Sequence, residues 1–224
     1  MPSLSKNLLS EKNLSMLHFE KFKKFYQGRQ IISIPSLTLV TGVYWLKGSN
    51  GSGKSTLLKA IAGLLSFEGE IILHPQLSLK KQSVAYRKLV NFAEAEPVFP
   101  AFLTGKEMIQ LFSTAKGHVP GQTEYYLESM QMQPYMDQHI GTYSSGMLKK
   151  LSLVLAFIGK PDLILLDEPL ITIDTESLQV LYQWILEKHQ QEGTSFLLAS
   201  HQELEHPELS KAAVIQVSEG LLKS

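Results

Sequence analysis

The sequence predicts an α/β fold with a mostly parallel sheet, an N-terminal antiparallel β-subdomain and an inserted α-helical subdomain. Two observations lead to this prediction. Short apolar runs typical of strands alternate with helical patterns along most of the chain, whereas residues 103–157 show helical patterns alone, punctuated by Pro100, Pro120 and Pro134. Alternating strands and helices are typical of parallel sheets, and a helix-only stretch between them indicates an insertion.

The expected elements follow in order. Residues 16–25 and 31–39 have the pattern of two strands joined near Gly28, and residues 43–46 form a buried strand that runs into a glycine-rich segment. Residues 55–65 have the period of a helix. Five further strand-like runs are expected at residues 70–73, 89–93, 163–166, 195–199 and 213–217.

Length, charge and composition limit the class of protein. The 224 residues suit one domain, with a core of residues 1–93 and 158–224 and a helical subdomain of about residues 94–157. The formal net charge of +0 gives no basic field, so we expect no nucleic acid partner. The chain has no cysteine, no apolar run near the roughly 18 residues of a membrane span, and a start too evenly mixed for a signal peptide. We therefore expect a cytoplasmic protein.

The glycine-rich segment GSNGSGKST has the spacing of a phosphate-binding loop, G-x-x-x-x-G-K-[ST], between an expected strand and an expected helix. Its glycines allow backbone N–H groups to surround an anion, Lys54 reaches the terminal phosphates, and Ser55 can hold Mg²⁺. The segment therefore predicts a P-loop NTPase core whose nucleotide-binding residues include Gly48, Ser49, Asn50, Gly51, Ser52, Gly53, Lys54, Ser55 and Thr56.

The segment LILLDEP supplies a second part of the expected site. Four apolar residues form a buried strand that brings Asp167 to its end, where a carboxylate can hold Mg²⁺ together with Ser55. Glu168 follows directly and is placed to polarise a water molecule for attack on the γ-phosphate. Asp-Glu-Pro after a strand is also an ordinary turn, but the phosphate-binding loop upstream favours the catalytic interpretation.

The segment YSSGM, residues 143–147, resembles the signature motif Leu-Ser-Gly-Gly-Gln of the ATP-binding cassette (ABC) family. Tyr143, Ser145 and Met147 depart from the motif, whereas Ser144 and Gly146 match it. In that family the segment begins a helix directed at the γ-phosphate of ATP in the opposite subunit. The resemblance therefore implies that Ser144, Ser145 and Gly146 act on the partner's nucleotide, a role that a hydroxyl and a helix N-terminus suit.

Three more residues match the family in chain order. Tyr26 stands where the family stacks an aromatic ring on adenine, with Phe25 as the alternative. In ITID, Asp174 has the acidic position of the D-loop, while Thr172 and Ile173 replace the usual Gly and Leu. LLASH ends at His201, which matches the histidine that senses the γ-phosphate, and the resemblance implies a catalytic role for it beside Glu168.

The segment NFAEAEPVFPAFLTGKE resembles the Q-loop that joins core and helical subdomain, but it contains no Gln. Glu94 is the preferred match to that ATP-contacting position and Glu96 is the alternative. A carboxylate there can bind Mg²⁺ or water through oxygen, but it cannot donate as an amide does.

The resemblance covers nearly the whole chain and implies an ATPase that uses ATP and Mg²⁺ and closes as a homodimer or heterodimer of ATP-binding subunits. It also implies a separate transmembrane permease subunit, and hence a peripheral position at the inner face of the cell membrane. The degenerate YSSGM and LTGKE segments resemble small bacterial exporters more than importers. The main alternative is a soluble ABC ATPase acting on ribosomes or DNA. A kinase or GTPase comes third, because the sequence has neither a guanine-reading Asn-Lys-x-Asp nor a lid for a second substrate.

Overall fold

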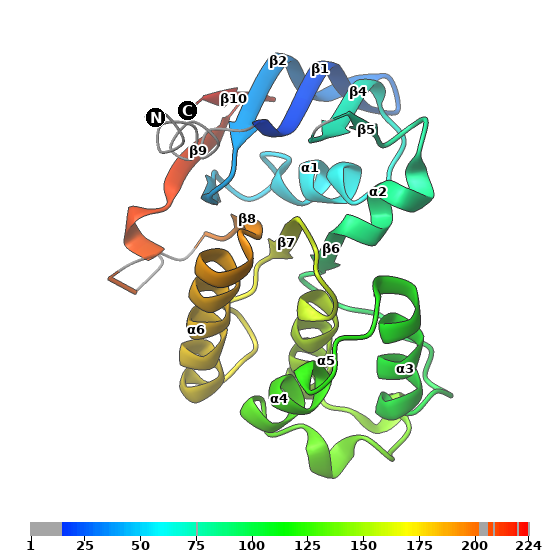
Figure 1. Cartoon of the computed structure of the whole chain (residues 1–224). Helices are drawn as coiled ribbons and strands as arrows, with labels where there is room; N and C mark the ends of the chain where they lie inside the picture. The colour runs from blue at the N-terminus through cyan, green and yellow to red at the C-terminus, as the bar shows by residue number, and fades with distance from the viewer. Residues whose placement is uncertain (1–14, 75, 202–205, 208, 219, 224) are drawn as a thin grey trace, which may run out of the picture.

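The computed structural model describes residues 15–74, 76–201, 206–207, 209–218 and 220–223. Figure 1 shows two sheets with helix α1 between them and the remaining long helices on the far side of the larger sheet. The predicted α/β fold class is confirmed. Within the described part of the chain, no helix combines the length and the apolar character needed to cross a membrane.

The smaller sheet is antiparallel and has the strand order β2-β1-β4-β5. Its strands are β1 (Ser15–Tyr26), β2 (Arg29–Val40), β4 (Glu68–Leu73) and β5 (Leu77–Ser78). The turn between β1 and β2 consists of Gln27 and Gly28, which both have positive φ angles, 48° and 77°. Two consecutive left-handed residues form the tight turn that matches the twist of a hairpin, so the predicted strand pair is confirmed.

The larger sheet has the order β10-β9-β3-β8-β7-β6, and all its pairs are parallel except the antiparallel pair of β10 and β9. Its strands are β3 (Val43–Lys47), β6 (Val90–Ala93), β7 (Leu163–Asp167), β8 (Ser195–Ala199), β9 (Ala213–Ser218) and β10 (Leu221–Lys223). Because the neighbours β3, β8, β7 and β6 run in parallel, their carboxyl ends meet at one edge of the sheet. Ligands of open α/β sheets bind at such an edge.

Both faces of the larger sheet are covered. Along β7, Leu163 and Leu165 pack in a cluster with the smaller sheet and α1, whereas Ile164 and Leu166 pack on the other side with α5 and α6. The period of two follows from the alternation of side chains along a strand. Burial on both faces explains the continuous apolar run that marked β7 in the sequence.

The helices are α1 (Lys54–Ile61), α2 (Ser83–Leu89), α3 (Gly105–Lys116), α4 (Gln122–Ser129), α5 (Ser145–Phe157) and α6 (Thr175–Glu192), with short 3₁₀ turns at Gln133–Tyr135, Ile140–Thr142 and Leu209–Lys211. The named elements between β6 and β7 are helices and 3₁₀ turns, as the sequence predicts, with one isolated antiparallel bridge between Thr104 and His139. Two expected boundaries are wrong: α1 ends four residues before position 65, and Leu89 ends α2 instead of beginning a strand. The sequence analysis did not predict α2, α6, β5 or β10.

Candidate functional site

The phosphate-binding loop connects the end of β3 to the start of α1 and is folded around its glycines. Gly51 and Gly53 have φ angles of 77° and 105°, which only glycine adopts without strain. Gly48 is required for a different reason: an added Cβ atom would lie 2.4 Å from the carbonyl oxygen of Val217. The buried Lys54 ammonium donates hydrogen bonds to the carbonyl oxygens of Gly48, at 2.7 Å, and Ser49, at 3.2 Å.

The groups that this loop presents to the adjoining cavity indicate what it binds. Gly51, Gly53 and Lys54 line that cavity at the N-terminus of α1. The Ser52 hydroxyl is buried without a hydrogen-bond partner among the described residues, but it does not line the cavity. Free backbone N–H groups at a helix N-terminus together with a lysine side chain attract an anion. The residues present therefore fit the phosphates of a nucleotide.

Ser55 and Asp167 form a pair suited to a metal ion. The Ser55 hydroxyl donates a hydrogen bond of 3.0 Å to Oδ1 of Asp167, and Asp167 is 1% exposed at the end of β7. Burial raises the pKa of the Asp167 carboxyl, while the hydrogen bond from Ser55 opposes that rise. A hydroxyl and a carboxylate are oxygen ligands of the kind that Mg²⁺ prefers, so the two residues fit the expected metal.

Glu168 and His201 lie together although they follow different strands. The Glu168 N–H donates to the carbonyl oxygen of Ala199 in β8, at 2.8 Å, which fixes Glu168 beside the end of that strand. The backbone of Glu168 has a φ of 44°, a left-handed conformation that costs free energy for a residue with a side chain. Strain of this kind is found at functional sites more often than elsewhere, which favours a catalytic role for Glu168.

An open cavity of about 450 Å³ lies between the phosphate-binding loop and Glu168, and neither Asp167 nor His201 lines it. It is lined by Tyr26, Ile31, Asn50, Gly51, Gly53, Lys54, Ser55, Thr56 and Glu168. Tyr26 is 45% exposed, and its ring lies 4.6 Å from the Lys24 ammonium. Phe25, the alternative adenine partner, does not line this cavity. The cavity therefore brings together an exposed aromatic ring, the phosphate-binding loop and Glu168, as the sequence analysis expects.

The segment at the Q-loop position lies at the end of β6. The Glu94 carboxylate forms an ion pair with Lys59 of α1, and its side chain is 35% exposed. Glu96 is exposed as well. Neither glutamate lines the cavity, so the structure does not bring Glu94 into direct contact with the loop residues.

The signature segment has a different environment. Ser144 is the N-cap of α5, and its hydroxyl accepts a hydrogen bond of 3.2 Å from the Met147 N–H. Ser144 and Ser145 are exposed and do not line the cavity of their own chain. Gly146 packs closely, since an added Cβ would lie 3.2 Å from the carbonyl oxygen of Thr172. The N-terminus of α5 therefore presents two exposed hydroxyls away from its own nucleotide cavity.

Asp174 connects the D-loop to the signature helix. It caps α6 by accepting a hydrogen bond from the Ser177 N–H, at 2.8 Å, and pairs with the Lys150 ammonium of α5, at 2.9 Å. The Lys150 ammonium, together with the hydrogen bonds from Ser177, holds the pKa of the Asp174 carboxyl well below its usual range. Asp174 is thus ionised near neutral pH and restrains the D-loop against α5.

Three lysines around the site, Lys59, Lys149 and Lys150, were not predicted from the sequence. Lys149 is 1% exposed, and burial lowers its pKa to about 8. The available signal was the pair of adjacent lysines in a helix that is otherwise apolar. A charged residue at a buried helical position requires partners, and these become visible only in the fold.

A phosphate-binding loop, a Ser55–Asp167 pair and a strained glutamate at neighbouring strand ends define a P-loop nucleotide-hydrolysing protein. The family model described as "ABC transporter" matches residues 35–171, more than half of the chain. The chain belongs to the ABC transporter family, as an ATP-binding subunit with ATPase activity, and the resemblance stated from the sequence is confirmed.

Known proteins agree with this assignment. The cytochrome c biogenesis ATP-binding export protein CcmA of Legionella pneumophila is 37% identical over 163 residues, which are 73% of this chain and 80% of the relative. An uncharacterized ABC transporter ATP-binding protein of Bacillus subtilis, YcbN, is 30% identical over 183 residues, 80% of this chain and 59% of the relative.

Two solved structures share the fold. An ATP-binding subunit of an ABC transporter has a TM-score of 0.81 and 23% identity over 94% of this chain and 89% of that one. A dimeric post-hydrolysis structure of the ATP-binding cassette MJ0796, bound to ADP and Pi, has a TM-score of 0.79 and 18% identity, covering 93% of this chain and 97% of that one.

Proposed function

We propose that the chain is the ATP-hydrolysing subunit of a membrane transporter and powers translocation through a separate permease by ATP-driven closure of two such subunits. The observation that carries the proposal is the exposed N-terminus of α5, whose Ser144 and Ser145 stand outside their own chain's cavity. A helix N-terminus attracts anions, and a second copy of the chain, or a similar subunit, holds a nucleotide whose γ-phosphate suits it. The dimeric structure of the cassette MJ0796 supports this arrangement.

Each residue of the site then has a defined role. The loop amides and Lys54 would hold the phosphates of ATP, and Tyr26 would stack on its base. Ser55 and Asp167 would hold Mg²⁺, which neutralises charge on the phosphate oxygens when bound. Glu168 accepts a proton from the attacking water, and His201 holds the Glu168 carboxylate in place through their 3.0 Å contact.

We also propose that the chain divides into a core and a helical subdomain, as the sequence predicts.

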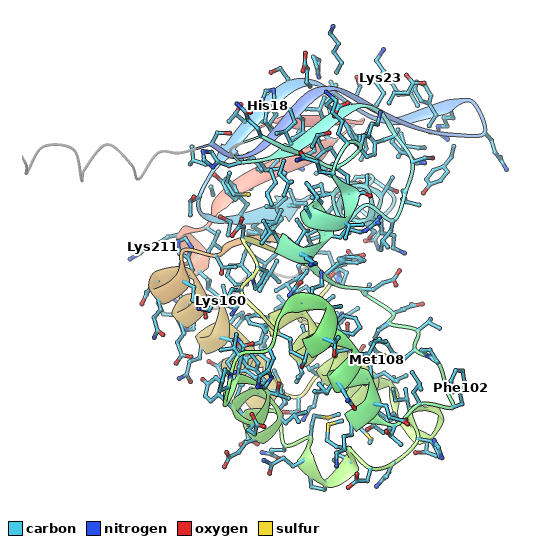
Figure 2. All side chains as sticks on the ribbon, turned by 45° about the vertical axis from the view of Figure 1, so that its right-hand side comes forward. His18, Lys23, Phe102, Met108, Lys160 and Lys211 are labelled. Carbon is cyan, nitrogen blue, oxygen red and sulfur yellow. The ribbon has the colours of Figure 1, made fainter. Side chains whose placement is uncertain are left out.

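The loop between β6 and α3 carries two large apolar side chains that are exposed. Val98 is 89% exposed and Phe102 is 76% exposed. Phe102 lies at the outer margin of the helical part in Figure 2. Large exposed apolar side chains beside a ligand-binding segment favour a protein partner there. We assign this loop as the surface that contacts the permease. That contact would hold the chain at the inner face of the cell membrane.

Purification from detergent-solubilised membranes tests the transport part of the proposal. The tagged chain should retain a multispanning membrane protein, and Phe102→Asp should remove it by placing a charge in the contact. Val214→Asp changes another exposed apolar residue, on β9 four strands away from β6, and should retain the partner. Retention of ribosomes or DNA in place of a membrane protein would support the soluble alternative.

The direction of transport is proposed to be export. The name of the Legionella relative, an export protein, supports this direction.

A further inference from the structure

A buried lysine of the signature helix lies directly behind the proposed metal site. The ammonium of Lys149 donates to the backbone carbonyl oxygens of Glu94, at 3.0 Å, Ala95, at 3.3 Å, and Asp167, at 3.0 Å. An ammonium has three N–H donors, so these contacts use all of them. Lys149 therefore joins α5 to two separate segments, the start of the Q-loop and the end of β7.

The two segments meet where β6 and β7 stop pairing with each other. That pairing ends at Ala93 and Leu166. Asp167 is still paired with Ala199 of β8, whereas Glu94 lies beyond the end of β6. Lys149 donates to the carbonyl oxygens of both Asp167 and Glu94. Its side chain therefore connects the two segments just past the last backbone pair between β6 and β7. The position of Glu94 relative to Asp167 is held by this one ammonium group, because β8 pairs with Asp167 but not with Glu94.

The charge of Lys149 is also unusual. Its side chain is 1% exposed, and among the described residues no carboxylate lies within ion-pair distance of its ammonium. The carboxylates of Asp167, Glu168 and Glu94 favour the ammonium from further away, but burial outweighs them and lowers the pKa of Lys149. Burying this charge is therefore costly, and Met or Leu would fill the helical position without that cost. Such a cost is explained if the ammonium is needed to fix the positions of the three carbonyl groups to which it donates.

The same helix begins at the segment proposed to contact the partner's nucleotide. Ser144 caps α5, and Lys149 follows five residues later on the rigid helix. We infer that Lys149 is a positioning residue for ATP hydrolysis. It ties the signature helix to the carbonyls of Asp167 and Glu94, so that docking of α5 on the partner's ATP and alignment of the metal-side carboxylates of its own chain occur together.

The inference rests on the metal site of the proposed function, and binding of Mn²⁺ tests it without measuring turnover. In the Glu168→Gln protein with ATP, Mn²⁺ binding is followed by electron paramagnetic resonance. Lys149→Met keeps the volume but removes the charge and all three donors, and it should weaken Mn²⁺ binding by about 10- to 100-fold, the usual effect of losing a group that orients metal ligands. Lys149→Arg keeps the charge and should restore most of the affinity.

Lys188→Met is the matched control, because Lys188 is also a buried lysine, 3% exposed, but its partners are Gly159 and Glu192, away from the site. It should lower the melting temperature without changing Mn²⁺ affinity. In the otherwise unaltered protein, Lys149→Met should lower kcat by about 10- to 100-fold with little change in the KM for ATP. If Lys149→Met does not fold, Lys149→Gln, which keeps an amide donor, is measured in its place.

The outcomes separate the two claims. Failure of the Glu168→Gln parent to bind Mn²⁺ with ATP would contradict the proposed metal site, and the inference with it. If the parent binds Mn²⁺ and the neutral variants at position 149 bind it equally well, the metal site stands and the positioning role of Lys149 is wrong. A loss of stability in Lys149→Met that merely matches Lys188→Met, with kcat unchanged, would likewise reduce Lys149 to a packing residue.

Discussion

Nδ1 of His201 lies 3.0 Å from Oε2 of Glu168, although 33 positions separate the two residues in the chain. The contact exists because β7 and β8 are parallel neighbours, so that their carboxyl ends deliver both side chains to one edge of the sheet. The glutamate is only 15% exposed at its side chain, whereas the histidine is 49% exposed. A carboxylate that is largely shielded from solvent and held by an imidazole is suited to accepting a proton from a water molecule beside it.

Replacing the carboxylate should therefore separate hydrolysis from binding. Glu168→Gln should lower ATP hydrolysis by about 10²- to 10⁴-fold, because the amide cannot accept the proton of the attacking water. ATP affinity should remain near that of the unaltered protein, since the loop and Lys54 are untouched. Phosphate release and binding of a fluorescent ATP analogue measure the two effects. Turnover that survives the substitution would assign the base to another group.

Tyr26 tests the assignment of the adenine partner. Removing its ring in Tyr26→Ala should weaken ATP binding by about 1 to 3 kcal/mol, by analogy with base stacking on aromatic side chains. Tyr26→Phe keeps the ring and should bind nearly as well as the unaltered protein. Calorimetry measures both affinities. Equal affinity of Tyr26→Ala and the unaltered protein would show that the exposed ring does not contact the base.

Glu94 tests the departure at the Q-loop position. Glu94→Gln should preserve or raise hydrolysis, because an amide can both accept and donate at this position. The ion pair with Lys59 joins groups that are each about one-third exposed, so its loss should change stability little. Steady-state ATPase assays and thermal melts measure these effects. A collapse of turnover would mean that the carboxylate itself is required.

The start of α3 allows a test of local stability. Thr104 and Glu107 form a capping box, in which the Thr104 hydroxyl accepts from the Glu107 N–H and the Glu107 carboxylate accepts from the Thr104 N–H. Thr104→Ala should lower the free energy of unfolding by about 1 kcal/mol. Thr114→Ala, at an exposed position in the last turn of the same helix, should be neutral or slightly stabilising because alanine favours helices. Denaturant titration compares them, and equal effects would contradict the capping account.

Most residues of the site could be predicted from the sequence because they lie in contiguous motifs. Residues 48–56 and Asp167 lie in short segments whose spacing alone defines their geometry, and the apolar run of β7 is visible because both of its faces are buried. The lysine contacts were not predictable, because Lys149 meets Glu94 and Asp167 only after two strands and a helix have packed together.

Local patterns also explain the errors in the elements. Leu89 and Val90 form one apolar pair in the sequence, although a helix ends at the first and a strand begins at the second. Helix α6 was overlooked despite usable signals at both ends, since Asp174 caps its start and Gly193, with a φ of 73°, ends it. Periodicity shows that apolar residues are buried, whereas caps and turns determine where each element begins.

The central claim is that the N-terminus of α5 acts on a nucleotide held by another chain. In the Glu168→Gln background, light scattering should show a closed dimer with ATP and Mg²⁺ and a monomer or open pair with ADP. Adding Ser144→Arg places a long side chain where α5 must approach the partner's γ-phosphate, so the dimer should be lost while monomer affinity for a fluorescent ATP analogue stays nearly unchanged. Lys54→Ala, which removes the ammonium proposed to contact the phosphates, should weaken ATP binding strongly and serves as the reference. If the double variant still dimerises with ATP, or loses nucleotide binding as severely as Lys54→Ala, Ser144 is only a helix cap and the claim is wrong.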